Sequence, residues 1–259
     1  MVFSDWTELT PKIDTIASVI IKRAMSTSTL TDEKSKPQLF ELPRFKDKSS
    51  ILVYGQSHSG KSYMVRKFLA DKHRYFERPF ATCIYCYGVF DESLNEMRDS
   101  ITDINFILHP GVPSMDLFES ITTSFCVVFD DLLTHMNSVI SDFFIMNSKH
   151  INAGRGCTVF LIVQDMHGNK FLKLCRRNRD VLILTHSPVD QSTMALENSR
   201  MFPNRKKFLQ TCMQMAVDNM GKYPHLIVDS HPRASKELTV YSDVFNKHGI
   251  LSVYKPAKM

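Results

Sequence analysis

Ile51-Leu-Val-Tyr-Gly-Gln-Ser-His-Ser-Gly-Lys-Ser62 combines an apolar strand, the pattern G-x-x-x-x-G-K-S and the start of a helix. The two glycines let the backbone curl so that its N–H groups face phosphate oxygens, and the helix offers its positive end to the same anion. Lys61 is expected to reach the β- and γ-phosphates, and the Ser62 hydroxyl to coordinate Mg²⁺. The pattern is a Walker A loop, so we expect ATP to bind at Gly55, Gln56, Ser57, His58, Ser59, Gly60, Lys61 and Ser62.

Apolar runs of strand length alternate with helical patterns on both sides of this loop. Such alternation predicts parallel strands with helices covering both faces of the sheet. We therefore expect an α/β fold of the P-loop NTPase type, a doubly wound, mainly parallel sheet of the ASCE/RecA-like division. The expected strands are Ile51–Tyr54, Ala81–Tyr87, Asn105–Leu108, Phe125–Phe129, Thr158–Val163, Val181–Leu184, Leu226–Val228 and Leu238–Tyr241.

The clearest helical pattern after the phosphate loop follows Asn137. Its expected apolar stripe contains Val139, Ile140, Phe143, Phe144 and Asn147, with Ser138, Ser141 and Asp142 on the other side. The helix that follows Gly60 has a similar stripe of Met64, Val65, Phe68 and Leu69. Both patterns have the period of a helix with one buried face.

Two acids follow the apolar strand Phe125–Phe129. A P-loop ATPase needs an acid next to its Mg²⁺, and Asp130 is placed to fill that role. Asp131 could orient and deprotonate the attacking water, although Glu is more usual at this position and reaches one methylene further. The same pair could instead cap a helix. We favour the Walker B interpretation because of the apolar strand that precedes the pair.

Gln164 ends the strand Thr158–Val163. The carboxyl ends of strands face the ligand crevice in a doubly wound sheet, so this amide can sense a γ-phosphate or position water. The alternative is a strand-end amide that makes only turn hydrogen bonds.

The composition of the 259 residues is that of a globular protein, with 43% hydrophobic residues and a net charge of +5. This charge permits an acidic partner such as nucleic acid without requiring one. The first residues do not resemble a secretory signal, and no apolar run approaches the roughly 20 residues that span a bilayer. We expect a reduced, intracellular protein without membrane contact. Residues 1–47 are expected to form a helix and a linker, and residues 48–259 the ATPase domain.

Taken together, the motifs resemble those of FtsK/HerA-type ATPases that package viral DNA, most closely those of Polinton (Maverick) elements and adintoviruses, with poxvirus-type packaging ATPases more distant. The resemblance covers roughly Phe45 to Pro232. It is carried by the phosphate loop and by Ile84-Tyr-Cys-Tyr-Gly88, His109-Pro-Gly-Val-Pro113, Val128-Phe-Asp-Asp-Leu132, Asn147-Ser-Lys-His150, Phe160-Leu-Ile-Val-Gln164 and the stretch from Asn178 to Asp190.

The resemblance implies a homo-oligomeric ring, a hexamer or a pentamer, that moves double-stranded DNA into a capsid with ATP and Mg²⁺. It implies that Lys61, Asp131 and Gln164 are catalytic and that Ser62 and Asp130 hold the metal. Such a protein would act in the host nucleus or cytoplasm, or in association with the virion, and would contact capsid proteins.

The arginine that a neighbouring subunit supplies in such rings is not assigned cleanly by the sequence. The family's usual arginine position holds Lys173, and a later arginine is replaced in Ser187-Pro-Val-Asp190. A guanidinium from a neighbour would neutralise charge on the transferred phosphoryl group. The candidates are Arg155, Arg176, Arg177 and Arg179.

Two other functions are compatible with a Walker A loop. One is a P-loop nucleoside or nucleotide kinase, and the other is a nucleotide-binding scaffold without catalysis. Asp165-Met-His-Gly168 matches the D-x-x-G of GTPases, but no N-K-x-D motif follows it. Cys83-Ile-Tyr-Cys86 lacks a second metal-binding pair, so we expect core packing there rather than zinc.

Overall fold

The computed structural model describes residues 42–151, 154–167, 169–187, 191–246 and 251–256. They belong to one compact unit, Glu41–Pro256. The N-terminal helix and linker expected from the sequence lie outside the described residues. Phe45, ahead of the domain boundary expected near Lys48, is 3% exposed and pairs with Phe76 in an isolated β-bridge.

A nine-stranded sheet forms the centre of this unit, in the order β3-β2-β4-β5-β1-β6-β7-β8-β9. Its five pairings from β3 to β6 are parallel. The α/β class and the mainly parallel sheet are therefore confirmed. The strands are β1 (Ser50–Tyr54), β2 (Thr82–Tyr87), β3 (Asn105–Pro110), β4 (Phe125–Asp130), β5 (Thr158–Val163), β6 (Val181–Thr185), β7 (His225–Asp229), β8 (Val240–Ser242) and β9 (Ser252–Val253).

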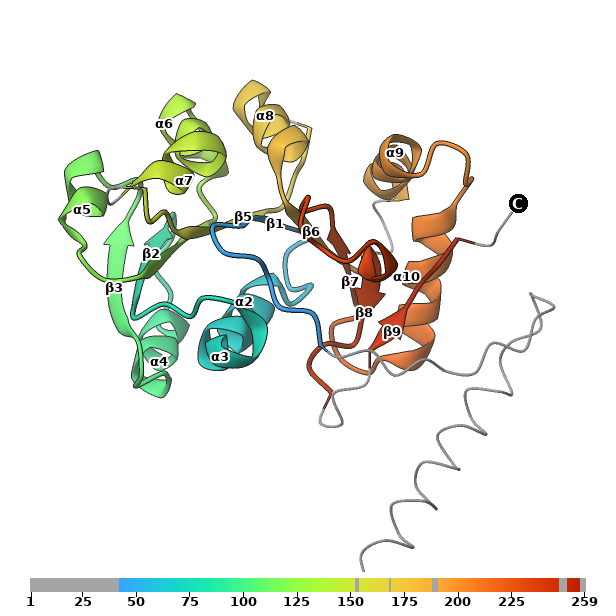
Figure 1. Ribbon diagram of the computed structural model, residues 1–259, viewed down its shortest axis with the longest axis horizontal. Helices are drawn as coiled ribbons and strands as arrows, with labels where there is room; N and C mark the ends of the chain where they lie inside the picture. Colours follow the sequence, from blue (N-terminus) through green and yellow to red (C-terminus); the bar gives the residue numbers. More distant parts are fainter. Residues whose placement is uncertain (1–41, 152–153, 168, 188–190, 247–250, 257–259) are drawn as a thin grey trace, which may run out of the picture. The chain divides into compact units, whose positions relative to one another are not determined.

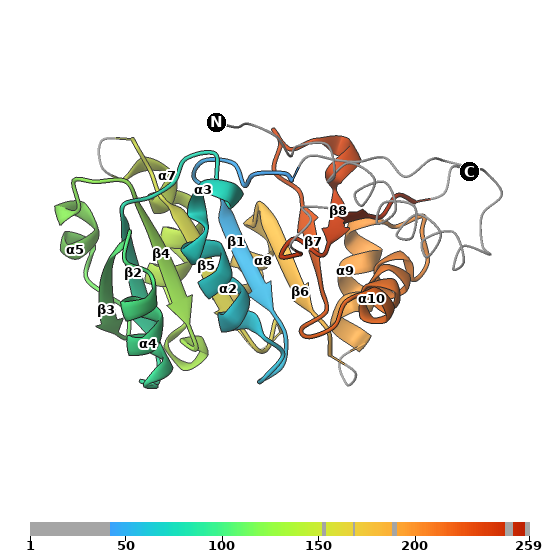
Figure 2. The same cartoon turned by 90° about the horizontal axis from the view of Figure 1, so that it is seen from below.

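Helices cover both faces of the sheet, which is why the central strands are apolar along their whole length (Figure 1). One face carries α2 (Lys61–Ala70), α3 (Lys72–Tyr75) and α4 (Ser93–Ser100). Figure 2 views the sheet from this side, with α2 in front of the central strands. The other face carries α5 (Met115–Ser120), α6 (Ser138–Asp142), α7 (Ser148–His150), α8 (Lys170–Asn178), α9 (Gln191–Met201) and α10 (Phe208–Asn219).

The helix expected after Asn137 is interrupted. The Asn137 side chain accepts a hydrogen bond from the Ile140 N–H and caps α6 as a helix N-cap should. A π-helical segment, Phe143–Asn147, then separates α6 from α7. Two assignments in the expected stripe were wrong: Val139 is 42% exposed, whereas Ser141 is fully buried. Ser141 tolerates burial because its hydroxyl donates to the Ser138 carbonyl within the same turn.

The last part of the sheet is antiparallel, from β6 through β7 and β8 to β9. Two helices, α9 and α10, connect β6 to β7. Because there are two of them, the chain re-enters the sheet at the end where β6 finished, and β7 therefore runs antiparallel to β6. The strand expected over Leu238–Tyr241 begins two residues later, as β8 at Val240, because Lys236–Leu238 form a 3₁₀ turn capped by the Ser235 side chain.

All six cysteines are free and buried, and all lie in the described part of the chain. Cys83 and Cys86 belong to the two cores on opposite faces of the sheet, as strand alternation requires. Burial raises the pKa of the Cys175 and Cys212 thiols to about 12 and also raises the pKa of Cys86, Cys126 and Cys157. The expectation that Cys83 and Cys86 are core residues is confirmed.

Candidate nucleotide-binding and hydrolysis site

The phosphate loop turns from the end of β1 into the first residue of α2. Gly60 has φ +92° and His58 has φ +62°, so the loop contains two left-handed residues. A β-carbon on Gly55 would lie 1.7 Å from Thr185 Oγ1, and one on Gly60 would lie 2.5 Å from the Tyr223 ring. Both glycines are therefore required by close neighbours, and Gly60 by its backbone angle as well.

Lys61 is turned into the loop that precedes it. Its side-chain nitrogen donates to the Gln56 carbonyl at 2.6 Å, and the residue is 7% exposed. Burial lowers the pKa of Lys61, while the nearby charges of Asp130 and Asp131 act in the opposite direction. An ammonium in a partly desolvated loop of this kind interacts strongly with an entering phosphate.

Ser62 and Asp130 meet at the carboxyl ends of β1 and β4. The Ser62 hydroxyl donates to Asp130 Oδ2 at 3.0 Å, and the Tyr85 hydroxyl donates to the same oxygen at 2.5 Å. Burial raises the pKa of Asp130, and the hydrogen bonds from Tyr85 and Ser62 oppose that rise. The hydroxyl and carboxylate are oxygen ligands of the kind that Mg²⁺ takes, and a cation here would favour the ionised form of the buried acid.

Asp131 lies in a hydrogen-bonded chain with Gln164 and Ser57. The Ser57 hydroxyl donates to Gln164 Oε1 at 2.8 Å, and Gln164 Nε2 lies 3.4 Å from Asp131 Oδ1. These hydrogen bonds link the phosphate loop to the ends of β4 and β5. Asp131 has φ +54°, and the 3₁₀ turn after it begins without a side-chain cap, so neither acid serves as a helix cap.

Several residues of this site were missed by the sequence analysis. Tyr85 holds Asp130 from β2, and Thr185 Oγ1 lies 2.7 Å from Ser59 Oγ at the end of β6. Gly88 donates its N–H to the Asp130 carbonyl, and a β-carbon there would lie 2.0 Å from the Asp131 carbonyl oxygen. Only the Tyr-Cys-Tyr-Gly run around β2 gave a signal, because it was part of the family resemblance.

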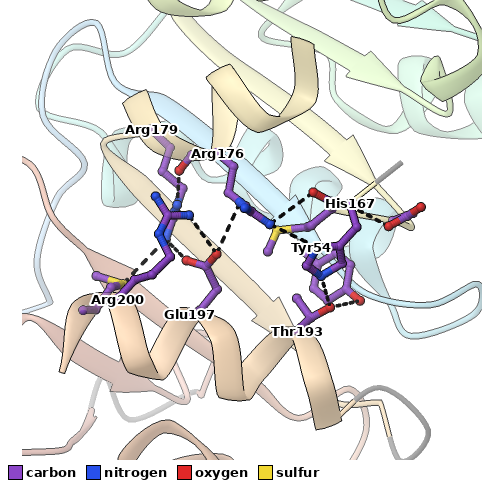
Figure 3. Close-up of polar contacts among 10 residues, drawn as sticks. Tyr54, His167, Arg176, Arg179, Thr193, Glu197 and Arg200 are labelled. Atoms are coloured by element: carbon purple, nitrogen blue, oxygen red, sulfur yellow. Dashed lines mark hydrogen bonds and ion pairs between the residues drawn. The ribbon is translucent and has the colours of Figure 1, made fainter. Parts of the chain in front are cut away.

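Arg176 and Arg179 are held in buried ion pairs within the molecule. Figure 3 shows both guanidinium groups against Glu197 of α9. Arg179 Nη2 lies 2.5 Å and Arg176 Nε 3.6 Å from the Glu197 carboxylate, and these side chains are 7% and 8% exposed. Burial lowers the pKa of both arginines, and Glu197 acts against that shift.

The other two candidate arginines lie toward the end of the sheet opposite the phosphate loop. Arg155 precedes β5 and donates to the Thr122 carbonyl at 3.3 Å. Arg177 is exposed near the end of α8, which leads into the start of β6. In a parallel sheet, both positions lie toward the amino ends of the strands, whereas the phosphate loop lies at the carboxyl ends.

Among the described residues, no group of three or more His, Cys, Asp or Glu side chains could hold a metal ion by itself. The same part of the chain contains no helix with the length and apolar character needed to cross a membrane. The Ser62–Asp130 pair contains only one carboxylate and is therefore not such a group. Two protein ligands suit a P-loop metal, because that metal takes most of its ligands from water and phosphate.

The fold and the site together define an α/β protein of the P-loop NTPase class. β5, which is followed by Gln164, lies between β1 with the phosphate loop and β4 with the acid pair. This interposed strand is the arrangement expected for the ASCE/RecA-like division.

Comparison with known proteins gives structural likenesses at low sequence identity. No family model and no curated protein sequence matches the chain. One similar structure is the genome packaging NTPase B204 from Sulfolobus turreted icosahedral virus 2 in complex with sulfate, with a TM-score of 0.47, 12% identity, and coverage of 83% of this chain and 99% of that one. Its complex with AMP gives a TM-score of 0.44, 14% identity, and coverage of 81% and 98%.

B204 from Sulfolobus turreted icosahedral virus, described as a DNA-packaging ATPase, gives a TM-score of 0.46, 13% identity, and coverage of 83% and 100%.

Proposed function

We propose that this protein hydrolyses ATP with Mg²⁺ and uses the energy to move double-stranded DNA into a viral or transposon capsid. The observation that supports hydrolysis is the convergence of three elements: Ser62 of α2, Asp130 and Asp131 at the end of β4, and Gln164 after β5 lie in two hydrogen-bonded groups beside Lys61. A kinase must deliver phosphate to a second substrate, whereas this arrangement provides a base and an amide suited to a water molecule.

Each residue has a defined role in this proposal. The phosphate loop binds the nucleotide, and Lys61 exchanges its Gln56 contact for phosphate oxygens. Ser62 and Asp130 would hold Mg²⁺, which neutralises charge between the β- and γ-phosphates when bound. Asp131 accepts the proton of the attacking water, and Gln164 orients that water through its amide.

A neighbouring subunit completes the site in this proposal. The two exposed candidates, Arg155 and Arg177, lie toward the amino ends of the strands, whereas the phosphate loop lies at the carboxyl ends. They could therefore act only on another subunit. Head-to-tail contacts form a ring when the rotation between successive subunits closes, and the proposed ring is a hexamer or a pentamer. Arg176 and Arg179 would first have to leave Glu197, and the buried carboxylate would then keep only Arg200, at 3.5 Å.

DNA and capsid proteins are the proposed partners, and the motif resemblance carries this part of the proposal. The protein would then act in the host nucleus or cytoplasm or on the virion. Exposed Lys206 and Lys207 before α10 could contact DNA phosphates without reading sequence.

The test is steady-state ATP hydrolysis by the full chain with and without linear duplex DNA. We expect DNA to stimulate hydrolysis and Asp131→Asn to lower it by at least about a hundredfold, since a positioned base contributes roughly that much. Lys61→Ala should weaken ATP binding as well as turnover. Hydrolysis that ignores DNA would argue against translocation, and hydrolysis only with a nucleoside acceptor would favour a kinase. Binding without hydrolysis would favour a scaffold.

A further inference from the structure

The turn that follows β5 places Gln164 outside the hydrogen-bonded ladder of the sheet. The pairing of β5 with β1 ends at Val163. Gln164 is the first member of residues 164–167, which we call the β5 turn, and it is exposed. Its side chain contacts Ser57 and Asp131, which are exposed as well. The position of the Gln164 amide therefore depends on what holds the β5 turn.

His167, at the other end of the β5 turn, links it to two helices. Its Nδ1 lies 3.3 Å from Arg176 Nη1 of α8, and its Nε2 lies 3.1 Å from Thr193 Oγ1 of α9 (Figure 3). A guanidinium can only donate, so Nδ1 accepts, and Nε2 carries the proton that is donated to Thr193. Both ring nitrogens are used within the molecule, so His167 has no ring nitrogen left for a nucleotide or an attacking water.

The β5 turn has two further attachments. The Met166 side chain is fully buried, and Arg176 Nη1 also donates to the Met166 carbonyl at 3.3 Å. The His167 N–H donates to Asp165 Oδ1 at 2.7 Å, which closes a turn of the kind that Asp side chains form with their own backbone. Because Gln164 is joined to this fixed segment by a single peptide unit, the segment determines where the Gln164 side chain begins.

Thr193 connects the β5 turn to the phosphate loop. It is 1% exposed, and its Oγ1 accepts from the Tyr54 hydroxyl at 3.2 Å as well as from His167. Tyr54 is the last residue of β1 and directly precedes Gly55, where the phosphate loop begins. One hydroxyl oxygen on α9 is therefore bonded both to the β5 turn and to the strand that carries the phosphate loop.

We propose that His167 is a positioning residue for hydrolysis: its bond to Thr193 holds the Gln164 amide in place relative to the phosphate loop. The bond from Arg176 orients the imidazole ring so that Nε2 faces Thr193. This inference rests on the proposed ATPase function and adds α9 to the elements that shape its site. His167 is exposed, so a substitution there opens no cavity in the core and can alter the site in a folded chain.

Three substitutions of His167 in the full chain test this bridge. His167→Ala removes both side-chain bonds, His167→Asn keeps an acceptor for Arg176, and His167→Gln keeps a donor long enough to reach Thr193. We expect the first two to lower kcat at least about tenfold and to change the KM for ATP by less than about twofold, because a displaced amide affects the reaction and not nucleotide binding. His167→Gln should keep most of the wild-type kcat.

Two outcomes of these assays would overturn the proposal. One is a wild-type kcat in His167→Ala, and the other is an equal loss in all three variants. A double substitution then asks whether His167 acts through Gln164. In a Gln164→Ala chain, His167→Ala should lower kcat no further, because the amide that it places is already absent. A further loss of about tenfold would mean that His167 acts by another route.

The side-chain amide signal of Gln164 in the NMR spectrum gives a measurement that needs no hydrolysis. Its absence from the spectrum of Gln164→Ala identifies it. The signal should shift in His167→Ala and His167→Asn and stay in place in His167→Gln, and an unchanged signal in all three would overturn the proposal. If the wild-type chain hydrolyses no ATP, the proposed function fails, and this signal still decides whether His167 places Gln164.

Discussion

Gly88 fixes the backbone position of Asp131, the proposed catalytic base, although Gly88 carries no functional group. A β-carbon at this position would lie 2.0 Å from the Asp131 carbonyl oxygen, which is backbone and cannot rotate away. We expect Gly88→Ala to displace Asp131 and to lower ATP hydrolysis by at least about tenfold, because small misplacements of catalytic groups have large effects on rate. Steady-state hydrolysis together with thermal unfolding checks this.

Gly111→Ala is the matched control for that substitution. Gly111 follows β3 with φ +70°, and a β-carbon there would meet nothing within 4 Å. The control should lose about 1 kcal/mol of stability through backbone strain while keeping its hydrolysis rate. Equal loss of activity in both variants would mean that stability, and not the position of Asp131, explains the effect.

Asp229 makes the stability of the protein depend on pH in a defined direction. Burial raises the pKa of this carboxyl to about 6, although the His231 N–H and the Lys46 charge oppose the rise. Between about pH 4 and pH 6 the folded state holds more protons than the unfolded state, so this group's contribution to stability falls as pH rises. Above pH 6 the buried carboxylate is unfavourable by on the order of 1–3 kcal/mol.

Asp229→Asn should therefore stabilise the protein at pH 8 and have little effect at pH 4. The amide oxygen can still accept from the His231 N–H, as Asp229 Oδ1 does at 3.0 Å. Urea unfolding of both proteins at the two pH values measures the difference. The same free-energy change at both values would mean that ionisation of Asp229 is not the cause.

At the level of elements, α8 and α9 are joined by a buried charge cluster. Glu197 is completely buried and contacts Arg176 and Arg179 of the α8 region (Figure 3). Glu197→Gln leaves two buried guanidinium groups without a counter-charge, which is destabilising by about 3–5 kcal/mol. Arg200, a third partner at 3.5 Å, is 33% exposed.

Arg200→Gln is the control for the buried cluster, and we expect it to change stability by less than about 1 kcal/mol because its side chain is partly solvated. The free energy of unfolding from urea titrations distinguishes the two variants. Similar small changes in both would show that the cluster adds little to the docking of α9.

The central parallel strands could be predicted closely because they are buried on both faces and read as continuous apolar runs. Thr158–Val163 matches β5 in full, and Ile51–Tyr54 differs from β1 by one residue. The short β9 was not predicted because two residues carry too little pattern. The π-helical segment was missed because Phe143 and Phe144 have the same spacing in either kind of helix.

The phosphate loop and the acid pair could be predicted because their spacing is local. The partners that complete the site could not, because they depend on the order of strands in the sheet. Tyr85 reaches Asp130 only because β2 lies next to β4, and Thr185 reaches the loop only because β6 lies next to β1. The sequence likewise gave no sign that Arg176 and Arg179 pair with Glu197 on another helix.

At the level of the whole molecule, the proposed ring makes hydrolysis depend on contact between subunits. We expect the activity per subunit to rise with protein concentration, because dilution separates each phosphate loop from its neighbour's arginine. Arg177→Ala should be inactive in the same way as Lys61→Ala. Gel filtration and steady-state hydrolysis over a dilution series would measure both effects.

Mixing these two inactive variants should restore part of the activity. An interface between the loop of an Arg177→Ala subunit and the arginine of a Lys61→Ala subunit contains every wild-type group. Lys61→Ala mixed with Asp131→Asn should recover nothing, because both changes affect the same half of the interface. No recovery in the first mixture would exclude Arg177, and the same design with Arg155→Ala tests the other candidate.

The burial of all six thiols has a practical consequence for such assemblies. Alkylating reagents attack exposed thiolates, and all six cysteine thiols of this chain are buried. A cysteine introduced at an exposed site, as in Arg177→Cys, should therefore react alone without prior removal of the native ones. Crosslinking or dye attachment through the introduced thiol could map which surfaces of adjacent copies meet. The six native cysteines would stay in place in the core of each copy.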